Sequence, residues 1–379
     1  MSGSYDYNII DVVKCLSLEV RHMNKTDWDV DCPFCTVNPV NGHNGKGKLN
    51  ICIPKDAFRC SRCDTHGGML DLYTLVKGVD RKQARQEILD YINHGITTDT
   101  HNICAKAQAE YNKRCKNRAS AQEIDRTYRA FLSLCVLEQQ HKENLLQRGL
   151  SEAQIKCFGF RTAPTHKEQH NKIINKLLFY GYRLEGVPGF FKDKSGRWNF
   201  NLFRFTQGIL IPMMSIDRKI QGFQIRLDNP RDGNKYLWFS SKNKAHGLSS
   251  GSPAHLSKPL SKDSDSVIYL TEGGLKADIA CALSGKPFIG VAGVSNQSDL
   301  PELFAYIKHF GINRVVDCFD RDCEYNEQVE KARRKLKSKV VKSGLIYSRM
   351  SWDNRFKGID DYMAAHDRCD WRFCVKEMS

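Results

Sequence analysis

The sequence predicts a multidomain α/β (α+β) protein with an N-terminal β-ribbon and helices, a mixed α+β middle region and a mostly parallel sheet near the C-terminus. Three patterns predict these parts. Two Cys-x-x-Cys pairs lie within residues 1–95, short apolar runs alternate with turn residues over 178–240, and strand patterns alternate with helix patterns from residue 266 onward. The last pattern is typical of a parallel sheet with helices on both faces.

The composition limits the class of protein. The chain has 379 residues, of which 41% are hydrophobic, so it can bury a substantial core. It carries 58 Lys and Arg against 43 Asp and Glu, a net charge of +15, which favours a polyanion such as nucleic acid as partner, although a generally basic surface has the same composition. We find no secretory signal and no apolar stretch of about 18 residues, so we expect a cytoplasmic protein without a membrane partner. The 15 cysteines are then expected to be thiols or metal ligands.

Residues 1–95 contain a predicted metal site. Cys32 and Cys35 form one Cys-x-x-Cys pair, and Cys60 and Cys63 form the second. Each pair can bring two thiolates to one ion, and two pairs complete the tetrahedral sulfur shell that Zn²⁺ accepts. Because such a shell leaves no open position, we expect the zinc to be structural.

The order of the motifs around these cysteines resembles a known family. The chain is similar here to the zinc-ribbon domain of bacterial and phage DNA primases. The motifs occur in this order: Cys-Pro-Phe-Cys, an alternating stretch over 46–53, Phe-Arg-Cys-Ser-Arg-Cys, Gly-Gly and two helical segments. The common pattern of that family has His as second ligand, where this chain has Cys35. The resemblance implies a template-binding domain that docks single-stranded DNA, with these candidates for stacking and phosphate contacts: Phe34, Phe58, Arg59, Arg62, Lys46 and Lys48. The alternative place for each aromatic residue is the ribbon core.

Two regions lie between the ribbon and the parallel sheet. Residues 96–127 are polar and charged, and we expect a linker or a loosely packed helix. Over 128–262 we expect a mixed α+β subdomain, with helical spacing over 128–160 followed by short strands such as Phe203–Phe205.

Residues 263–379 form the predicted parallel sheet with a C-terminal extension. Short buried strands over Val267–Leu270 and Phe288–Val291 alternate with helical segments. The last two elements before the extension are expected to be a basic helix over 324–338 and a strand over Val340–Ile346.

Three carboxylates follow apolar strands in this region. Glu272 stands where a strand turns through glycines into a helix, and Asp320 and Asp322 follow the strand that begins at Arg314. Ligands of an open α/β sheet bind beyond the carboxyl ends of its strands, and alternate residues of an extended segment share a face. Clustered carboxylates suit Mg²⁺ and would repel one another without a cation. The alternatives are a carboxylate at a helix N-terminus for Glu272 and surface caps for the two aspartates.

The order Glu-Gly, then Asp-x-Asp, resembles the TOPRIM fold of primases, topoisomerases and some nucleases. The resemblance implies that Glu272 is a general acid/base or a metal contact and that Asp320 and Asp322 hold magnesium or manganese. The later Gly358-Ile359-Asp360-Asp361 is similar to the ending of TOPRIM-like domains in mobile-element primases, which makes Asp360 a further magnesium candidate.

A basic set precedes the acids. The segment from Gln147 to Gly159, with Arg-Gly-Leu-Ser near its start, is similar to the segment that opens the primase catalytic core. In that family, Arg and Lys of the segments that follow face the metal site. The resemblance therefore implies that Arg226, Lys235 and Lys276 contact nucleotide or DNA phosphates. Taken singly, each of these three residues can instead be a solvated surface cation, and the same holds for the basic stretch 331–339.

These motifs together indicate a DNA primase, a magnesium-dependent nucleotidyltransferase and DNA-directed RNA polymerase that makes RNA primers on single-stranded DNA from nucleoside triphosphates. No stretch fits a Walker loop, so we expect any replicative helicase to be a separate protein. The end of the chain soon after Asp361 suggests a phage, plasmid or mobile-element origin. Two other functions share these motifs: a single-stranded-DNA-binding accessory protein whose acidic cluster does not catalyse, and a TOPRIM nuclease.

Overall fold

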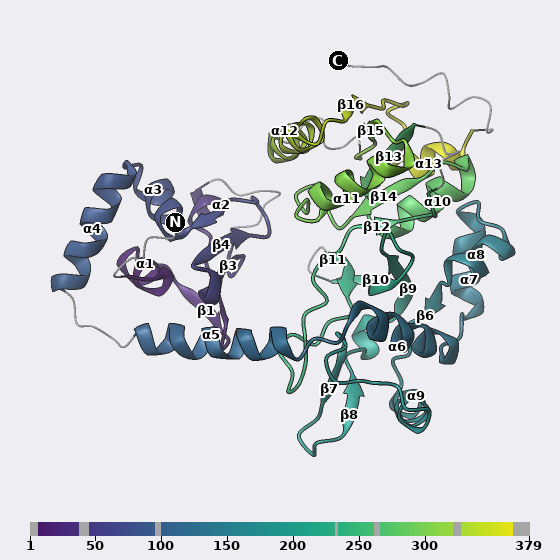
Figure 1. Ribbon diagram of the computed structural model, residues 1–379, viewed down its shortest axis with the longest axis horizontal. Helices are drawn as coiled ribbons and strands as arrows, with labels where there is room; N and C mark the ends of the chain where they lie inside the picture. The colour runs from purple at the N-terminus through teal and green to yellow at the C-terminus, as the bar shows by residue number, and fades with distance from the viewer. Residues whose placement is uncertain are drawn as a thin grey trace. The chain divides into compact units, whose positions relative to one another are not determined.

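An N-terminal antiparallel sheet and a C-terminal, mostly parallel sheet are the main frameworks of the protein in this computed structural model (Figure 1). The structure describes residues 7–37, 45–94, 100–231, 234–260, 266–320 and 327–366. The chain divides into two units, Met1–Asn117 and Arg118–Ser379. The mixed α+β fold class predicted from the sequence is confirmed. None of the helices in the described ranges combines the length and the apolarity that crossing a membrane requires.

The first unit contains a five-stranded antiparallel sheet in the order β1-β2-β3-β4-β5. Leu49 and Ile51 of β3 are fully buried, whereas the alternate residues Asn50 and Cys52 are only partly buried. This alternation is typical of a sheet with one face on a core. In chain order, the elements are α1 (Ile9–Cys15), β1 (Val20–Met23), β2 (Asp27–Val30), α2 (Pro33–Val37), β3 (Leu49–Cys52), η1 (Ile53–Lys55), β4 (Ala57–Cys60), β5 (His66–Gly68), α3 (Met69–Lys77), α4 (Arg81–His94) and α5 (Thr100–Lys116).

Helices complete the core of the first unit. Asn8 caps α1 through side-chain hydrogen bonds from the N–H groups of Ile10 and Asp11. The apolar residues of α1 and α3 then join those of the sheet in one cluster. The stretch expected to be a linker or a loosely packed helix contains α5, whose Ala107 is fully buried in this cluster.

The second unit begins with helices and an antiparallel sheet of four strands in the order β11-β10-β9-β6. A hairpin of β7 and β8 accompanies this sheet. The elements are α6 (Ala121–Leu134), α7 (Gln139–Gln147), α8 (Glu152–Phe158), β6 (Arg161–Thr162), α9 (Lys167–Phe179), β7 (Phe190–Lys192), β8 (Trp198–Phe200), η2 (Arg204–Thr206), β9 (Gly208–Met214), β10 (Ile220–Arg231) and β11 (Asn234–Trp238).

The second unit continues with a five-stranded sheet in the order β12-β14-β13-β15-β16. Strands β14, β13, β15 and β16 are parallel, and only the edge strand β12 is antiparallel. The elements are β12 (His255–Leu256), β13 (Val267–Glu272), α10 (Gly274–Ser284), β14 (Phe288–Val291), α11 (Leu300–Ile307), η3 (Lys308–Phe310), β15 (Arg314–Asp317), α12 (Glu327–Lys342), β16 (Ile346–Arg349) and α13 (Ile359–Ala364).

Helices cover both faces of the parallel sheet, as the alternating pattern predicts (Figure 1). Ile268 and Leu270 of β13 join the core that contains α11 and α12. Tyr269, between them, joins the opposite core, to which α10 and α13 contribute. Because consecutive strand residues point to opposite faces, β13 is buried on both sides.

Helix α10 links the two sheets of the second unit. Leu275 and Ile279 of α10 pack in one cluster with Ile211 and Met213 of β9. A buried hydrogen bond of 2.7 Å joins His255 Nε2 to Asp278 of the same helix. The backbone N–H of Met214 donates to His255 Nδ1 at 2.9 Å, so Nε2 carries the proton that His255 donates to Asp278.

Two predicted strands are wrong. Phe203–Phe205 lies at a 3₁₀ turn, because the side chain of Thr206 accepts a hydrogen bond from the N–H of Phe203 and closes the turn. The segment Val340–Ile346 is mostly the end of α12 and its turn, and the strand starts only at Ile346. Val340 is buried one helical turn after Leu336, so the helical face continues to Lys342.

Candidate functional site

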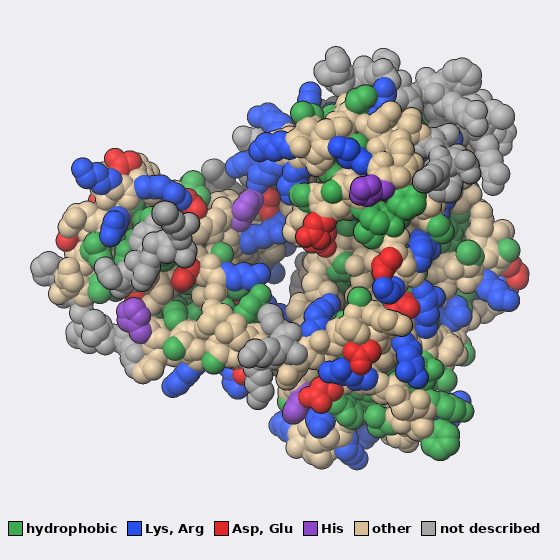
Figure 2. Space-filling model, viewed as in Figure 1, with side chains coloured by type: hydrophobic (Ala, Val, Ile, Leu, Met, Phe, Trp, Pro, Cys, Tyr) green, Lys and Arg blue, Asp and Glu red, His purple; other side chains and the backbone are tan. Residues whose placement is uncertain are grey.

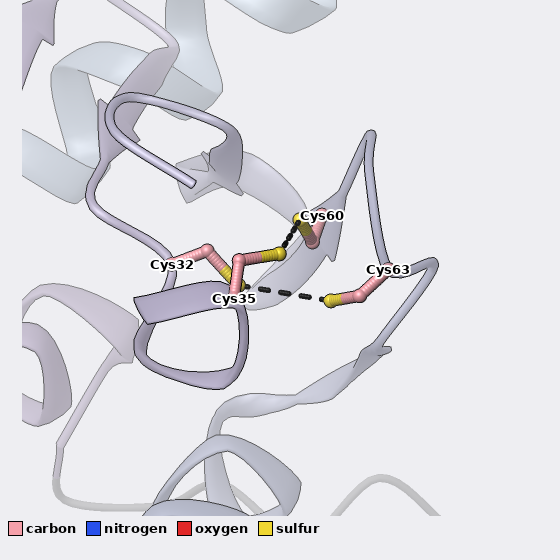
Figure 3. Close-up of side chains that lie close together, drawn as sticks. All are labelled: Cys32, Cys35, Cys60 and Cys63. Carbon is pink, nitrogen blue, oxygen red and sulfur yellow. Dashed lines mark hydrogen bonds between the residues drawn. The ribbon is translucent and has the colours of Figure 1, made fainter. Parts of the chain in front are cut away.

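The four paired cysteines of the first unit form one buried cluster (Figure 3). Their sulfur atoms all lie within 4.8 Å of one another. Cys32 Sγ is 3.7 Å from Cys63 Sγ, and Cys35 Sγ is 3.7 Å from Cys60 Sγ. Each of these two contacts therefore joins one cysteine of the first Cys-x-x-Cys pair to one cysteine of the second.

Local structure brings these thiols together. The first pair lies at α2, and the second lies where β4 ends in a turn. Gly45 has φ +71° and packs so tightly that a Cβ there would be 2.3 Å from Cys35 Cβ. The carbonyl of Gly45 accepts the N–H of Cys32 at 3.1 Å. A glycine at position 45 thus permits both the turn and the close approach.

The donor set of this cluster fits structural zinc. Burial raises the pKa of the Cys35 thiol to about 12, so a thiolate there needs a compensating cation. Four sulfur ligands fill a tetrahedral shell and leave no position for a substrate. Two polar contacts can support metal-bound thiolates. Thr65 Oγ1 lies 3.1 Å from Cys63 Sγ, and the N–H of Arg62 lies 3.4 Å from Cys60 Sγ.

The candidate DNA contacts of the ribbon differ in exposure. Phe58 is only 3% exposed and stacks with Phe34, with ring centroids 6.4 Å apart. Phe58 is therefore part of the ribbon core, the alternative to a base-stacking role. Arg59 is exposed and pairs with Asp64 at 2.9 Å. Lys46 is exposed, whereas Lys48 and Arg62 are partly buried.

In the second unit, two predicted carboxylates lie at the carboxyl edge of the parallel sheet. Glu272 is the last residue of β13, and its Oε1 accepts a hydrogen bond of 3.1 Å from the N–H of Val294, which follows β14. Asp320 follows β15, which pairs with β13 in parallel. Gly273, with φ +83°, turns the chain from Glu272 into α10. Asp322 lies outside the described residues.

Lys276 of α10 lies among three carboxylates. Its Nζ is 2.5 Å from each carboxylate oxygen of Asp320, which is itself only 3% exposed. Burial works to lower the pKa of Lys276, but the carboxylates of Asp320, Asp360 and Glu272 outweigh it and raise that pKa. The predicted cation and three of the predicted acids therefore belong to one electrostatic cluster.

Asp360, in the first turn of α13, completes the cluster. Burial raises the pKa of this carboxyl, and Lys276 and Arg148 oppose that effect. Arg148 Nη1 lies 3.8 Å from the carboxylate. The position of Gly358 shows how close the groups are, because a Cβ there would be 2.4 Å from Asp360 Oδ1, 3.2 Å from Lys276 Nζ and 3.5 Å from Asp320 Oδ1.

A cationic wall surrounds Tyr236 of β11, close to Asp360. Arg226 of β10 is the register partner of Tyr236 of β11. Burial raises the pKa of Tyr236, and three cations that surround it counteract that effect: Arg226, Lys276 and Arg148. Asp360 also acts on this hydroxyl. Tyr236 thus marks the point where β11, α10 and the end of α7 meet.

Lys235 does not share this wall. It is exposed and precedes Tyr236 on the strand, so its side chain points to the opposite face of the sheet. Arg148 and Tyr236 were not among the predicted site residues. The Arg-Gly-Leu-Ser motif was the signal for Arg148, whereas nothing in the local sequence singles out Tyr236.

A pocket of about 450 Å³ adjoins Asp360. Its wall combines charged, amide, aromatic and small side chains from α7, α10, α13 and the turn before α13, namely Asn144, Gln147, Arg148, Ile279, Phe356, Asp360, Asp361, Ala364 and Ala365. Asp360 and Arg148 of the cluster therefore line a hollow on one side of the second unit.

The basic helix α12 is only partly a surface element. Lys331, Arg334 and Lys337 are exposed, and Lys and Arg side chains gather over this helix in Figure 2. Arg333, expected to be a surface cation, is buried, and its Nε lies 3.2 Å from the buried carboxylate of Asp317. Its Nη2 also donates to the carbonyl of Phe319 at 3.1 Å, next to Asp320.

Comparisons with known proteins identify the fold. The family model of a domain of unknown function, DUF3854, matches residues 259–369. No curated protein sequence matches the chain. The crystal structure of the primase of Aquifex aeolicus, comprising its zinc-binding and RNA polymerase domains, is similar with a TM-score of 0.53 and 14% identity, over 98% of this chain and 84% of that one.

A second similar structure is the RNA polymerase domain of the Mycobacterium tuberculosis primase DnaG, solved in complex with double-stranded DNA. It has a TM-score of 0.52 and 14% identity, over 68% of this chain and 80% of that one. The protein therefore has the fold of the zinc-binding and polymerase domains of bacterial primases. The resemblance stated from the sequence is confirmed at the level of the fold.

Proposed function

We propose that this protein is a DNA primase that synthesises RNA primers on single-stranded DNA. The observation that carries the proposal is the meeting of buried carboxylates and cations at the carboxyl edge of the parallel sheet, with Lys276 Nζ 2.5 Å from Asp320 and Arg148 3.8 Å from Asp360. Nucleotidyl transfer needs both kinds of group, since carboxylates hold divalent ions and cations hold the triphosphate. The primase-like fold supports the same reading.

In the proposed mechanism, Glu272, Asp320 and Asp322 would hold magnesium or manganese, with Asp360 beside them. Ions bound there would supply Lewis-acid stabilisation of the attacking oxygen and of the pyrophosphate that leaves. Arg226 and Arg148 would hold phosphates of the incoming nucleotide, with Lys276 beside them. Glu272 is the candidate acceptor of the proton from the attacking 3′-hydroxyl, whose oxygen forms the new bond to the α-phosphorus.

The first unit contributes binding in this proposal. Lys46, Lys48, Arg59 and Arg62 would contact template phosphates around the zinc site, and Phe34 is the remaining aromatic candidate for base stacking. The cytoplasmic location and a separate helicase as partner remain predictions from the sequence, as do the domain boundaries.

Primer synthesis by the zinc-loaded full chain tests the proposal. Single-stranded template, labelled ribonucleotides and Mg²⁺ or Mn²⁺ should yield short RNA, and Asp320→Ala should reduce the yield by roughly a hundredfold or more. The control Lys308→Ala removes a surface cation that donates to the carbonyl of Ser343, and it should leave the yield unchanged. Equal yields from both variants would refute the assignment.

Two other outcomes select the alternative functions. Template binding without incorporation under either metal would identify a non-catalytic accessory protein. DNA cleavage in the absence of nucleotides, lost in Asp320→Ala, would identify a nuclease.

A further inference from the structure

The acidic cluster contains a cation of its own. Lys276 Nζ contacts both oxygens of Asp320 at 2.5 Å, so the ammonium occupies the position that a metal bound to this carboxylate would need. The side chain of Lys276 is 19% exposed and that of Asp320 is 4% exposed, so water screens the contact only weakly. Metal binding at Asp320 therefore has to overcome an existing ion pair.

Asp360 offers the ammonium a second place. Within the described part of the chain, Asp360 Oδ1 is buried and has no hydrogen-bond partner. It borders Gly358 on the same side as Lys276 Nζ, and the missing side chain at Gly358 leaves the space between the two groups open. The other oxygen of this carboxylate lies 3.8 Å from Arg148 Nη1. A buried acceptor without a donor is unfavourable, so Asp360 gains by receiving Lys276.

We propose that Lys276 is the resident cation of this site, which a divalent metal displaces from Asp320 and which then moves to Asp360. The inference rests on the proposed function, because it assumes that Asp320 is a metal ligand. It assigns Asp360 to the lysine and not to the metal.

The chemistry of lysine suits such a movement. The ammonium is a compact charge on a flexible four-carbon stem, so a few torsions carry it from one carboxylate to its neighbour. A divalent ion at Asp320 repels the ammonium, whereas Asp360 attracts it. Because the ammonium stays within the cluster, it offsets carboxylate charge in both states and limits the repulsion among the buried carboxylates.

Mn²⁺ binding to the zinc-loaded full chain, followed by the electron paramagnetic resonance of free Mn²⁺, tests this inference without any activity assay. Lys276→Met keeps the length of the side chain and removes the charge, and it should raise Mn²⁺ affinity roughly tenfold. Asp360→Asn removes the charge that receives the lysine and should lower the affinity roughly fivefold. In the Lys276→Met background, Asp360→Asn should have no effect.

Controls separate this result from general effects of charge. Lys219→Met removes a lysine that is paired with Asp217 at 2.5 Å outside the site, and it should leave Mn²⁺ affinity unchanged. Asp320→Asn gives the background of binding elsewhere. Thermal unfolding of each variant verifies folding. Asp360→Asn keeps the contact of Lys276 with Asp320, so it tests the inference even where Lys276→Met unfolds.

Three results would overturn the inference. An equal loss of affinity from Asp360→Asn in both backgrounds would make Asp360 a metal ligand. Unchanged or weaker binding in Lys276→Met, with normal binding by the unmodified protein, would remove the displacement and leave the proposed function intact. No difference between the unmodified protein and Asp320→Asn would remove the metal site, and the proposed function with it.

Discussion

The two candidate metal sites are built in opposite ways. The thiol cluster of the first unit comes from two short motifs, Cys32 to Cys35 and Cys60 to Cys63, each at one turn of the chain. The acidic cluster of the second unit combines residues from α7, α10, α13 and the ends of β13 and β15, from Arg148 to Asp360. The first has four equivalent ligands, whereas the second mixes carboxylates with cations.

This difference separates structural from chemical metal binding. Four buried thiols can satisfy one ion completely, so the ion acts as a cross-link within the first unit. In the proposed function, the carboxylates that share their site with Lys276 would hold the catalytic ions, and Asp360 among them lines a pocket. The variants below test whether the thiol cluster governs the stability of the first unit and whether the second unit's site governs activity.

The largest effect is expected from Cys60→Ser. Removal of one thiolate should release zinc, whose binding contributes about 10–16 kcal/mol to folding in small zinc domains. The first unit should then become sensitive to protease while the second stays resistant, which zinc analysis and limited proteolysis of the full chain measure. Cys52→Ser, in the same sheet but outside the cluster, is the matched control. Retained zinc in Cys60→Ser would contradict the four-thiol site.

The next effect is expected in the second unit, from Arg333→Met. The variant leaves the buried carboxylate of Asp317 with the hydroxyl of Tyr347 at 2.7 Å and the N–H of Phe319 at 2.9 Å, but without the guanidinium of Arg333. Breaking a buried ion pair in this way costs about 3–5 kcal/mol, so denaturant unfolding should show a clear loss of stability. The exposed neighbour gives the control Arg334→Met, expected within about 0.5 kcal/mol of the unmodified protein. Equal losses in both variants would mean that the ion pair has no special role.

A smaller effect is expected from Arg226→Gln, on activity alone. If Arg226 holds a nucleotide phosphate, kcat/KM for ribonucleotides should fall roughly tenfold, about 1.4 kcal/mol. Arg197→Gln, at a side chain that is 80% exposed beside the β7–β8 turn, should not change it. Both variants should have a normal zinc content, which would show that the change in activity does not come from the thiol cluster. An unchanged kcat/KM in Arg226→Gln would remove this residue from the cationic wall.

The smallest effect concerns pH and is confined to the second unit. Burial lowers the pKa of His170 below its ordinary 6.5. Above pH 6.5 the ring is neutral in folded and unfolded chains and contributes no pH dependence. As the pH falls below 6.5, the unfolded chain takes up a proton that the folded chain resists, so stability decreases until the folded pKa is passed.

Denaturant unfolding of His170→Gln at a series of pH values measures this contribution. The ring contacts the carbonyl of Pro164 at 3.0 Å, so the variant should be less stable near neutrality. The difference from the unmodified protein should shrink below pH 6.5. A difference that stays constant down to acid pH would show that His170 titrates equally in both states.

Sequence reasoning succeeded where spacing alone defines geometry. The four cysteines were predictable because a Cys-x-x-Cys turn brings its own thiols together. Glu272 and Asp320 were predictable because both follow parallel strands, whose carboxyl ends lie at one edge. The face of Lys235 was not predictable, because it depends on how β10 and β11 pair, with Arg226 opposite Tyr236.

Burial of charge was the main feature that the sequence did not reveal. Arg333 stands in a run of lysines and arginines that is typical of an exposed helix, yet it contacts Asp317 in the core. Tyr236 and Arg148 come from segments with no local sign of their meeting. Such contacts depend on packing between elements that are distant in the chain.

The amino-acid sequence by itself determined the thiol cluster, the alternation of strands and helices, and the carboxylates at strand ends, because each follows from the spacing of neighbouring residues. Only the tertiary structure decided that Lys276 pairs with Asp320 beside Asp360, and that Arg148 lies 3.8 Å from Asp360. The physical reason is that buried charges are stable only with partners, and the partners come from elements that the fold alone brings together.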